Sequence, residues 1–280
     1  MEKYSQEFPI RLMAKVLDVS VSGYYSWLTR KPSQSEQYNQ LLSDKIGTLF
    51  FKHHRRYGSP RITKALNNDG LKVNKKRVAR LMREQGWRAK ASKRYKATTN
   101  SHHDLPVAPN LLKQNFTASA PNEKWASDIT YIWTDEGWLY LAVILDLYSR
   151  KIIGWSQSNR MTRQLVIDAL NMALWRRKMP EKVILHSDRG SQYCSADYQK
   201  LLKKYNLRCS MSKKGDCYDN SMLESWNHSL KVEAIHGEKF KTRDEAKAHI
   251  FEYIELYYNR IRLHSGLGYL TPEQFEQKVA

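Results

Sequence analysis

The chain has 280 residues, of which 41% are hydrophobic, enough to bury at least one sizeable core. Its 47 Lys and Arg against 28 Asp and Glu give a net charge of +19, which indicates a polyanionic partner, nucleic acid before an anionic membrane. The longest apolar run, residues 139–145, is too short to cross a bilayer, the first residues lack a signal-peptide core, and the three cysteines form no CxxC pair, so we expect a reduced, cytoplasmic protein without membrane contact.

The positive charge is concentrated in the N-terminal part of the chain. Residues 1–118 carry 23 Lys and Arg against 8 Asp and Glu, whereas residues 119–280 carry 24 against 20. This division predicts a basic part that grips DNA, joined to a nearly neutral part with another task.

The first predicted elements are two short helices within residues 9–29. Apolar residues from Ile10 to Leu17 have helical spacing, a break follows at residues 18–20, and a second run passes through Trp27. The tight link predicts a helix-turn-helix-like module over residues 1–34, although an ordinary helical hairpin has the same pattern. Residues 30–39 are polar and contain Pro32, so we expect a linker there.

A second helical, helix-turn-helix-like DNA-binding module is predicted for residues 40–95. Residues 67–70 divide it into two amphipathic helices, and the second helix repeats Arg77, Arg80 and Arg83 at helical spacing. We expect these arginines to contact DNA phosphates, the alternative being a solvated basic face. Residues 96–120 are basic and then polar, which predicts a linker that becomes ordered on DNA.

From Pro121 the pattern changes to strands. Strands are expected at 125–133, 138–147, 151–157, 183–188 and 207–212, helices at 162–178, 195–205 and from about 221 to 235, and terminal helices at 240–262 and 271–279. Three hairpin-linked strands followed by alternating helices and strands predict an α/β fold, a ribonuclease-H-like mixed sheet flanked by helices and preceded by the small all-α modules. Residues 121–236 would form this core and residues 237–280 a helical C-terminal extension.

Three acidic residues have the setting of one kind of active site. Asp128 lies within an apolar strand, Asp188 ends another, and Glu224 stands at the start of a helix. A carboxylate in a strand is costly unless a cation or hydrogen bonds hold it. Three such groups can converge on a pair of Mg²⁺ ions, the apparatus of phosphoryl transfer on nucleic acid. Each residue also has an alternative interpretation. Asp128 could be a surface acid on an edge strand, Asp188 could start a turn, and Glu224 could close a capping box with Ser221.

The sequence motifs around these acids resemble those of the OrfB-type transposases of bacterial insertion sequences, in the group named after insertion sequence three. The resemblance is carried by PNEKWASDITY, ILDLYSRKIIGW, LHSDRGSQY, SMSKKGDCYDNSMLES, SLKVE and YYNRIRLHSGLGYLTPEQF. It implies a retroviral-integrase-like core and a catalytic triad of Asp128, Asp188 and Glu224 with 35 residues between the last two. It also implies a catalytic, DNA-contacting basic residue at Lys231, and two Mg²⁺ ions per site with Mn²⁺ able to substitute. Residues 226–227, Trp-Asn, depart from the family's two aromatics, which puts DNA stacking there in doubt.

Further contacts are expected around the triad. The second tier comprises His186, Gly190, Gln192 and Tyr193, of which Gln192 and Tyr193 are expected to contact DNA, although core packing is as good an interpretation of Tyr193. Lys213 and Lys214, in a loop over residues 212–220, are expected to contact DNA as well. The His pairs at 53–54 and 102–103 do not predict a zinc site, because no cysteine precedes Cys194.

The resemblance implies a DNA transposase that cleaves insertion-sequence ends and transfers the strands to target DNA. It also implies at least two copies on paired ends, and an upstream OrfA protein as a partner or fused by frameshifting, in the bacterial nucleoid. A retroviral-type integrase is a second enzymatic interpretation, which the missing zinc module disfavours. An inactive or domesticated DNA-binding derivative is the non-enzymatic alternative.

Overall fold

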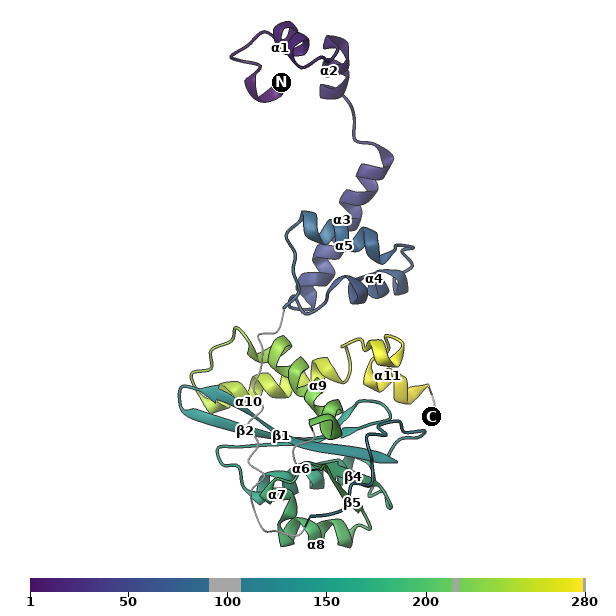
Figure 1. The fold of residues 1–280 in the computed structure, drawn as a ribbon, viewed down its shortest axis with the longest axis vertical. Helices are drawn as coiled ribbons and strands as arrows, with labels where there is room; N and C mark the ends of the chain where they lie inside the picture. Colours follow the sequence, from purple (N-terminus) through teal and green to yellow (C-terminus); the bar gives the residue numbers. More distant parts are fainter. Residues whose placement is uncertain (91–106, 214–216, 279–280) are drawn as a thin grey trace. The chain divides into compact units, whose positions relative to one another are not determined.

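A computed structural model describes residues 1–90, 107–213 and 217–278, which form two compact units, Met1–Arg88 and Ala89–Ala280. The first unit is helical (Figure 1). Its elements are η1 (Glu2–Tyr4), α1 (Ile10–Val16), α2 (Val21–Leu28), α3 (Gln34–Lys52), α4 (Ser59–Asn68) and α5 (Lys75–Glu84). The predicted short helices and the division between α4 and α5 are confirmed.

The linker predicted for residues 30–39 is wrong from residue 34 onward, because α3 begins there. A capping box starts the helix: the Ser33 hydroxyl accepts from the Glu36 backbone N–H at 3.2 Å, and the Glu36 carboxylate accepts from the Ser33 N–H at 2.6 Å. These bonds satisfy amide groups that a helix start leaves without partners.

The second unit contains a mixed five-stranded sheet in the order β3-β2-β1-β4-β5. Its strands are β1 (Lys124–Thr134), β2 (Gly137–Asp146), β3 (Ile152–Ser158), β4 (Ile184–Ser187) and β5 (Arg208–Met211). β1, β2 and β3 pair antiparallel, whereas β1, β4 and β5 pair parallel. All five predicted strands are confirmed to within a residue or two at their ends.

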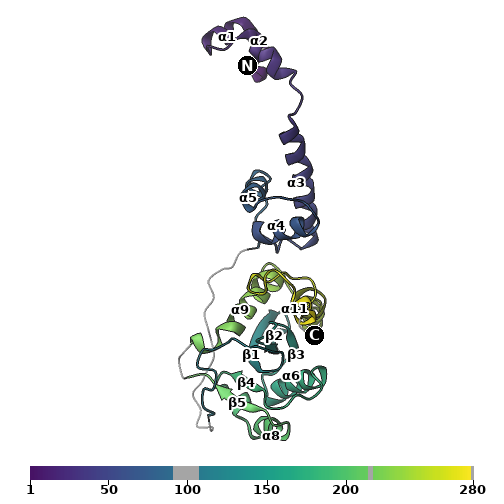
Figure 2. The same ribbon diagram turned by 90° about the vertical axis from the view of Figure 1, so that its right-hand side faces the viewer.

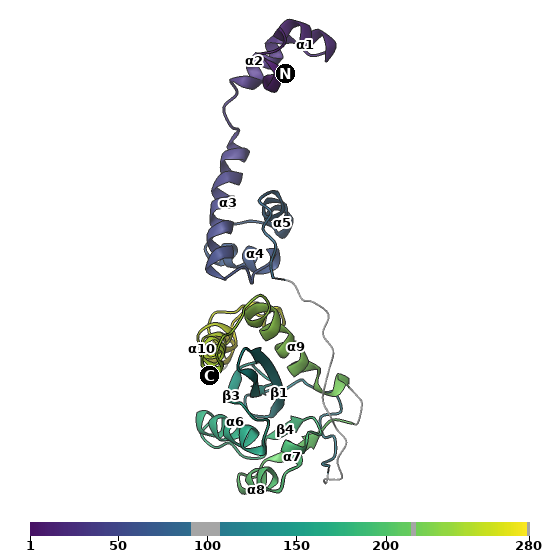
Figure 3. The same cartoon turned by 90° about the vertical axis from the view of Figure 1, so that its left-hand side faces the viewer.

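Helices cover both faces of this sheet (Figure 2). One face carries α6 (Arg163–Arg176), α7 (Ser191–Cys194) and α8 (Ala196–Lys204), and a core that includes Trp125, Leu170 and Tyr198 fills the space beneath them. The other face carries α9 (Ser221–Leu230), α10 (Arg243–Phe251) and α11 (Pro272–Gln277), of which α9 and α10 are labelled in Figure 3. The short turn η2 (Cys217–Asn220) precedes α9. Two π-helical turns, η3 (Lys231–Ile235) and η4 (Glu252–Tyr258), follow α9 and α10, and η5 (Ser265–Leu267) precedes α11.

Residues 237–278 are tied to the sheet and to α9 by buried polar contacts. The Asn259 side chain accepts from the Ile152 N–H at 3.0 Å and donates to its carbonyl at 2.9 Å. Arg262, 5% exposed, forms an ion pair with Glu233 of η3 at 2.7 Å. Arg177 of α6 binds both Asp146 and Glu276. The C-terminal helices therefore complete the same core instead of forming a separate one.

Part of the predicted linker contacts β5, around residues 109–111. The Met211 N–H donates to the Pro109 carbonyl at 3.4 Å and the Leu111 N–H donates to the Ser210 hydroxyl at 2.9 Å. Leu112 is 2% exposed. Residues 109–112 of the predicted linker are therefore packed against the sheet, and an effect of DNA on this stretch stays a prediction.

Candidate active site

Asp128 and Asp188 lie side by side because of the register of two parallel strands. β1 and β4 pair up to Ser127 opposite Ser187, so each aspartate directly follows one residue of this last pair. β4 ends there, whereas β1 continues to Thr134. Carboxyl ends of neighbouring parallel strands meet at one edge, where side chains can act on a common ligand.

The electrostatic setting of Asp128 is unfavourable for its charge. Burial, the nearby charge of Asp188 and, more weakly, that of Glu224 raise the pKa of Asp128 to about 8. The Ile129 backbone and the Asn227 side chain oppose this rise by hydrogen bonding to the carboxylate. Of these contacts, the Asn227 amide donates to Asp128 Oδ2 at 2.8 Å from α9. Two neighbouring carboxylates thus share a site in which one of them retains a proton near neutral pH.

Gly190 lets the backbone bind Asp188 closely. Its N–H donates to Asp188 Oδ1 at 2.9 Å. A Cβ atom at this position would lie 3.0 Å from the same oxygen and 3.1 Å from Gln192 Oε1, closer than ordinary contacts. A larger residue at 190 would therefore displace the Asp188 carboxylate.

Helix α9 carries Glu224 on its outer side. Leu223, Trp226 and Leu230, all at most 2% exposed, form its inner stripe, at the spacing expected of a helix that buries one face. Asn220 precedes the helix and no side chain caps it, so Glu224 is not used in the capping box that Ser221 offers. Glu224 is exposed, and partial desolvation raises its pKa.

Lys231 follows directly at the start of η3. Its ammonium lies 5.1 Å from the centre of the Tyr131 ring, three residues beyond Asp128 on β1. Burial lowers the pKa of Lys231, and Tyr131 and Asp128 oppose that change. The buried pair of Glu233 and Arg262 anchors the same turn, so the position of Lys231 is set by packing as well as by α9.

The donor set fits a divalent cation of the Mg²⁺ type. Hard oxygen ligands suit Mg²⁺, and a cation would offset the burial and the repulsion from Asp188 that together raise the pKa of Asp128. In the described residues no group of three His, Cys, Asp or Glu side chains lies close enough together to hold a metal. The two aspartates are close enough for their charges to interact, whereas Glu224, exposed on α9, has only a weak influence on Asp128.

The predicted DNA contact of Tyr193 is wrong, because its side chain is buried in the core. It is 1% exposed, its hydroxyl is 3.0 Å from the Ser127 hydroxyl, and its ring packs edge-on against Tyr198. Tyr193 is core, because the short helix α7 points it under the sheet. His186 is also fully buried, with its Nδ1 2.8 Å from the Ser210 hydroxyl, so neither side chain reaches a ligand at the surface.

Other predicted contacts stay predictions. Gln192 is partly exposed and donates to the Met161 carbonyl at 3.0 Å. Lys213 is exposed, with its backbone N–H bound to Asp219 at 2.7 Å, and Lys214 lies outside the described residues. Trp226 packs against Tyr258 at 5.9 Å, where its ring is not available for stacking on DNA.

The three arginines of α5 differ in their surroundings. Arg77 donates to Asn39 at 2.9 Å and lies over the Tyr38 ring at 4.7 Å. Arg80 pairs with Glu84 at 2.8 Å on an exposed surface, and Arg83 is exposed. Arg77 therefore also holds α5 against α3, which periodicity alone did not predict.

Asn227 is the site residue that sequence reasoning missed. The sequence shows Asn227 only as a departure from the two aromatic residues usual in the family. No local pattern predicts that residue 227 contacts residue 128. A polar residue three positions after an acid on the same helix was the available signal, since residues i and i+3 share a face.

Comparison with known proteins gives the following likenesses. Residues 118–217 and 224–279 match two integrase core domain families, and residues 37–95 match an HTH-like domain. Transposase InsF for insertion sequence IS3A of Escherichia coli (strain K12) is 55% identical over 280 residues, which cover 99% of this chain and 97% of that protein. The IS600 uncharacterized 31 kDa protein of Shigella sonnei is 45% identical over 266 residues, 95% of this chain and 98% of that protein.

Among solved structures, a chain of the simian T-cell lymphotropic virus intasome aligns with 82% of this chain and 74% of its own length, at 16% identity and a TM-score of 0.49. The family matches and the sheet described above confirm the predicted fold class, an integrase-core α/β unit preceded by a helical unit with an HTH-like domain. Within the described residues, no helix has the length and apolar character needed to span a bilayer.

Proposed function

The chain belongs to the transposase family of insertion sequence IS3, and from this premise we propose that it is a DNA transposase that cuts insertion-sequence ends and joins them to target DNA. The observation that carries the proposal is the position of Asp128, within β1, beside Asp188, which follows the last residue of the parallel strand β4, with the pKa of Asp128 raised to about 8. Paired carboxylates with a raised pKa are typical of catalytic sites, and carboxylates of this kind hold the metal ions in metal-assisted phosphoryl transfer.

Asp128, Asp188 and Glu224 would hold the Mg²⁺ ions. When bound, such ions activate the attacking oxygen and stabilise charge on the phosphate and the leaving oxygen. Asp188 is oriented by the Gly190 N–H and Asp128 by the Asn227 amide. Lys231 would hold a DNA phosphate beside the carboxylates, since its ammonium lies next to β1.

The basic first unit would supply most of the grip on DNA, through the phosphates that Arg77, Arg80, Arg83 and their neighbours reach. The match of residues 37–95 to an HTH-like domain supports this role. We further propose that at least two copies pair the two ends, and that an OrfA-type protein contributes to assembly, in the bacterial nucleoid. Exposed apolar side chains on α1 and α2, such as Val16 and Trp27, support a protein partner for that region.

The test is a joining assay with labelled ends of the chain's own insertion sequence. The parent chain should join ends to a plasmid in Mg²⁺ and in Mn²⁺, and should be inactive with EDTA. Asp128→Asn, Asp188→Asn and Glu224→Gln should each abolish joining and leave DNA affinity within about threefold, because each removes a metal-binding charge at nearly constant volume. Joining by one of these variants at a rate near the parent's would remove that residue from the proposed site.

An inactive DNA-binding derivative is the alternative. It predicts end binding by the parent chain without any metal-dependent joining. No observation on the described residues favours it over the enzyme.

A further inference from the structure

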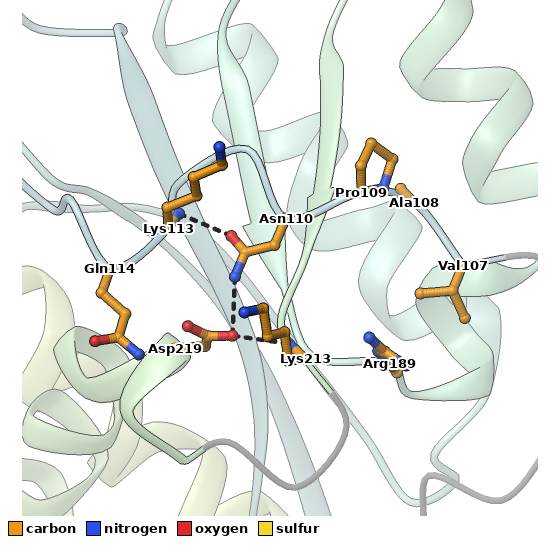
Figure 4. Close-up of a pocket in the computed structure, with 9 residues that line it drawn as sticks. All are labelled: Val107, Ala108, Pro109, Asn110, Lys113, Gln114, Arg189, Lys213 and Asp219. Atoms are coloured by element: carbon orange, nitrogen blue, oxygen red, sulfur yellow. Dashed lines mark hydrogen bonds between the residues drawn. The ribbon is translucent and has the colours of Figure 1, made fainter.

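A pocket of about 530 Å³ lies between the segment before β1 and the loops that follow β4 and β5 (Figure 4). Residues 107–114 form one wall, held against β5 by the contacts of Pro109 and Leu111 described above. Arg189, which follows the catalytic-site residue Asp188, forms another wall together with Lys213. Segments far apart in the sequence thus build one concave surface.

Positive charge dominates this pocket. Lys113, Arg189 and Lys213 line it, each from a different segment, against a single lining carboxylate, Asp219. Asp219 is 2% exposed, and its Oδ2 accepts from the Asn110 amide at 2.9 Å and from the Lys213 backbone N–H at 2.7 Å. The Asp219 carboxylate therefore links the two walls of the pocket through these hydrogen bonds, which Figure 4 shows as dashed lines.

The two lysines are available for an anionic ligand. Within residues 107–213 and 217–278, neither Lys113 nor Lys213 has a carboxylate at ion-pair distance, and both are exposed. The Arg189 Nε donates to the Ser212 carbonyl at 2.7 Å, which fixes the base of its guanidinium at the pocket wall. A guanidinium with flanking ammonium groups is a donor set for phosphate oxygens.

The pocket is adjacent to the proposed catalytic site. Consecutive Cα atoms are about 3.8 Å apart, so the Arg189 wall begins one residue from the Asp188 carboxylate. A DNA strand that presents a phosphate to Asp128 and Asp188 therefore has further phosphates within reach of this pocket. Val107, Ala108 and Pro109 give it an apolar side, which suits a deoxyribose next to a phosphate.

We propose that this pocket binds a backbone phosphate of the DNA strand that runs into the active site, through Lys113, Arg189 and Lys213. The inference rests on the proposed function, because it assigns the ligand as DNA. It gives residues 107–114, which precede the sheet, a direct part in holding the substrate.

The first experiment is lysine footprinting of the full-length chain without metal. The protein is acetylated with an amine-reactive reagent, alone and with a duplex that carries one end of its insertion sequence, and each lysine is followed by mass spectrometry. Lys113 and Lys213 should be protected severalfold by DNA, whereas Lys200 and Lys203, exposed on α8, should react equally in both samples. Asp188→Asn should show the same protection, because it removes the chemistry and leaves the pocket intact.

The second experiment measures the salt dependence of binding to the same duplex. Replacing both pocket lysines by glutamine should reduce the slope of log K against log salt by about 0.9, the value for one phosphate on duplex DNA. The matched change of Lys200 and Lys203 to glutamine should leave the slope unchanged, and arginine at both pocket positions should restore it.

Acetylation of Lys113 at equal rates with and without DNA, or an unchanged slope for the pocket variant, would overturn the proposal. Joining of ends by the parent chain in the same preparation would show that the pocket inference alone had failed. Absence of joining together with normal protection would instead count against the proposed enzyme and leave the pocket as a DNA site.

Discussion

Replacing Asp128 with asparagine should stabilise the metal-free protein at alkaline pH while it abolishes catalysis. The pKa of Asp128 rises from 3.8 to about 8, through burial first and the charge of Asp188 second. An acid whose pKa is higher in the folded state keeps its proton better when folded, so stability falls as pH rises between about 4 and about 8. Asparagine has no charge to lose, and its oxygen can still accept from Asn227.

The magnitude follows from linkage. At about 1.36 kcal/mol per pKa unit, the full shift would amount to roughly 5 kcal/mol at about pH 8. Asp128 is partly accessible to solvent and hydrogen-bonded, and screening at such a site reduces the effect. We therefore expect about 2 kcal/mol, which raises the melting temperature of a unit this size by about 4–8 °C.

Calorimetry on the parent and Asp128→Asn, in EDTA at about pH 8 and about pH 5, measures this effect in the transition of the second unit. The gain should be about a third as large at the lower pH, because about pH 5 lies only about one unit above the ordinary pKa of 3.8, whereas about pH 8 lies about four units above it. Adding Mg²⁺ should stabilise the parent and leave the variant unchanged, because a ligand stabilises only the state that binds it. A variant that melts below the parent at about pH 8, or shows the same gain at both pH values, would refute the assigned charge state of the aspartate pair.

Four further predictions concern substitutions at five residues. Lys231→Ala should reduce end joining more than tenfold with a change in DNA affinity below about threefold, and Lys231→Arg should keep part of the activity because its charge survives; equal joining by the alanine variant and the parent would make Lys231 structural. Asn227→Leu should raise the Mg²⁺ concentration needed for half-maximal joining and shift the pH profile of joining to higher pH, since the bond that favours ionised Asp128 is lost; an unchanged profile would contradict this. Gly190→Ala should lower joining by at least tenfold with native circular dichroism, because its Cβ displaces Asp188; parent-like joining would show that the carboxylate tolerates the shift. Arg83→Gln should weaken DNA binding without affecting melting, whereas Arg77→Gln should lower the melting temperature of the first unit as well, since Arg77 packs on Tyr38; identical melting of the two variants would count against that difference.

Much of the second unit could be predicted from the sequence, because its strands are apolar runs separated by turn residues. The same reasoning placed Asp128 within one buried strand and Asp188 at the end of another, and the parallel register of β1 and β4 then brings the two together. The start of α3 was also readable, from the capping box of Ser33 and Glu36. It was missed because Pro32 and the polar composition of residues 30–39 suggested a linker.

Contacts between distant segments could not be predicted in this way. Tyr193 comes shortly after the turn residues Asp188, Arg189 and Gly190. Only the packing of α7 against the sheet shows that its side chain belongs to the core. Asn227 meets Asp128 because α9 packs across β1, a geometry that no local pattern contains. The π-helical turns after α9 and α10 are likewise products of packing, since helical periodicity predicts continuous α-helices there.

The attachment of residues 237–278 to the sheet has a genetic consequence. Arg262 neutralises the buried Glu233, and Asn259 satisfies the backbone of Ile152, so loss of either leaves a buried polar group without its partner. A stop codon that removes these residues would therefore yield an unfolded product instead of a shorter working transposase. Copies of the gene that carry such a late nonsense mutation should therefore be inactive, even when the codons for Asp128, Asp188 and Glu224 are intact.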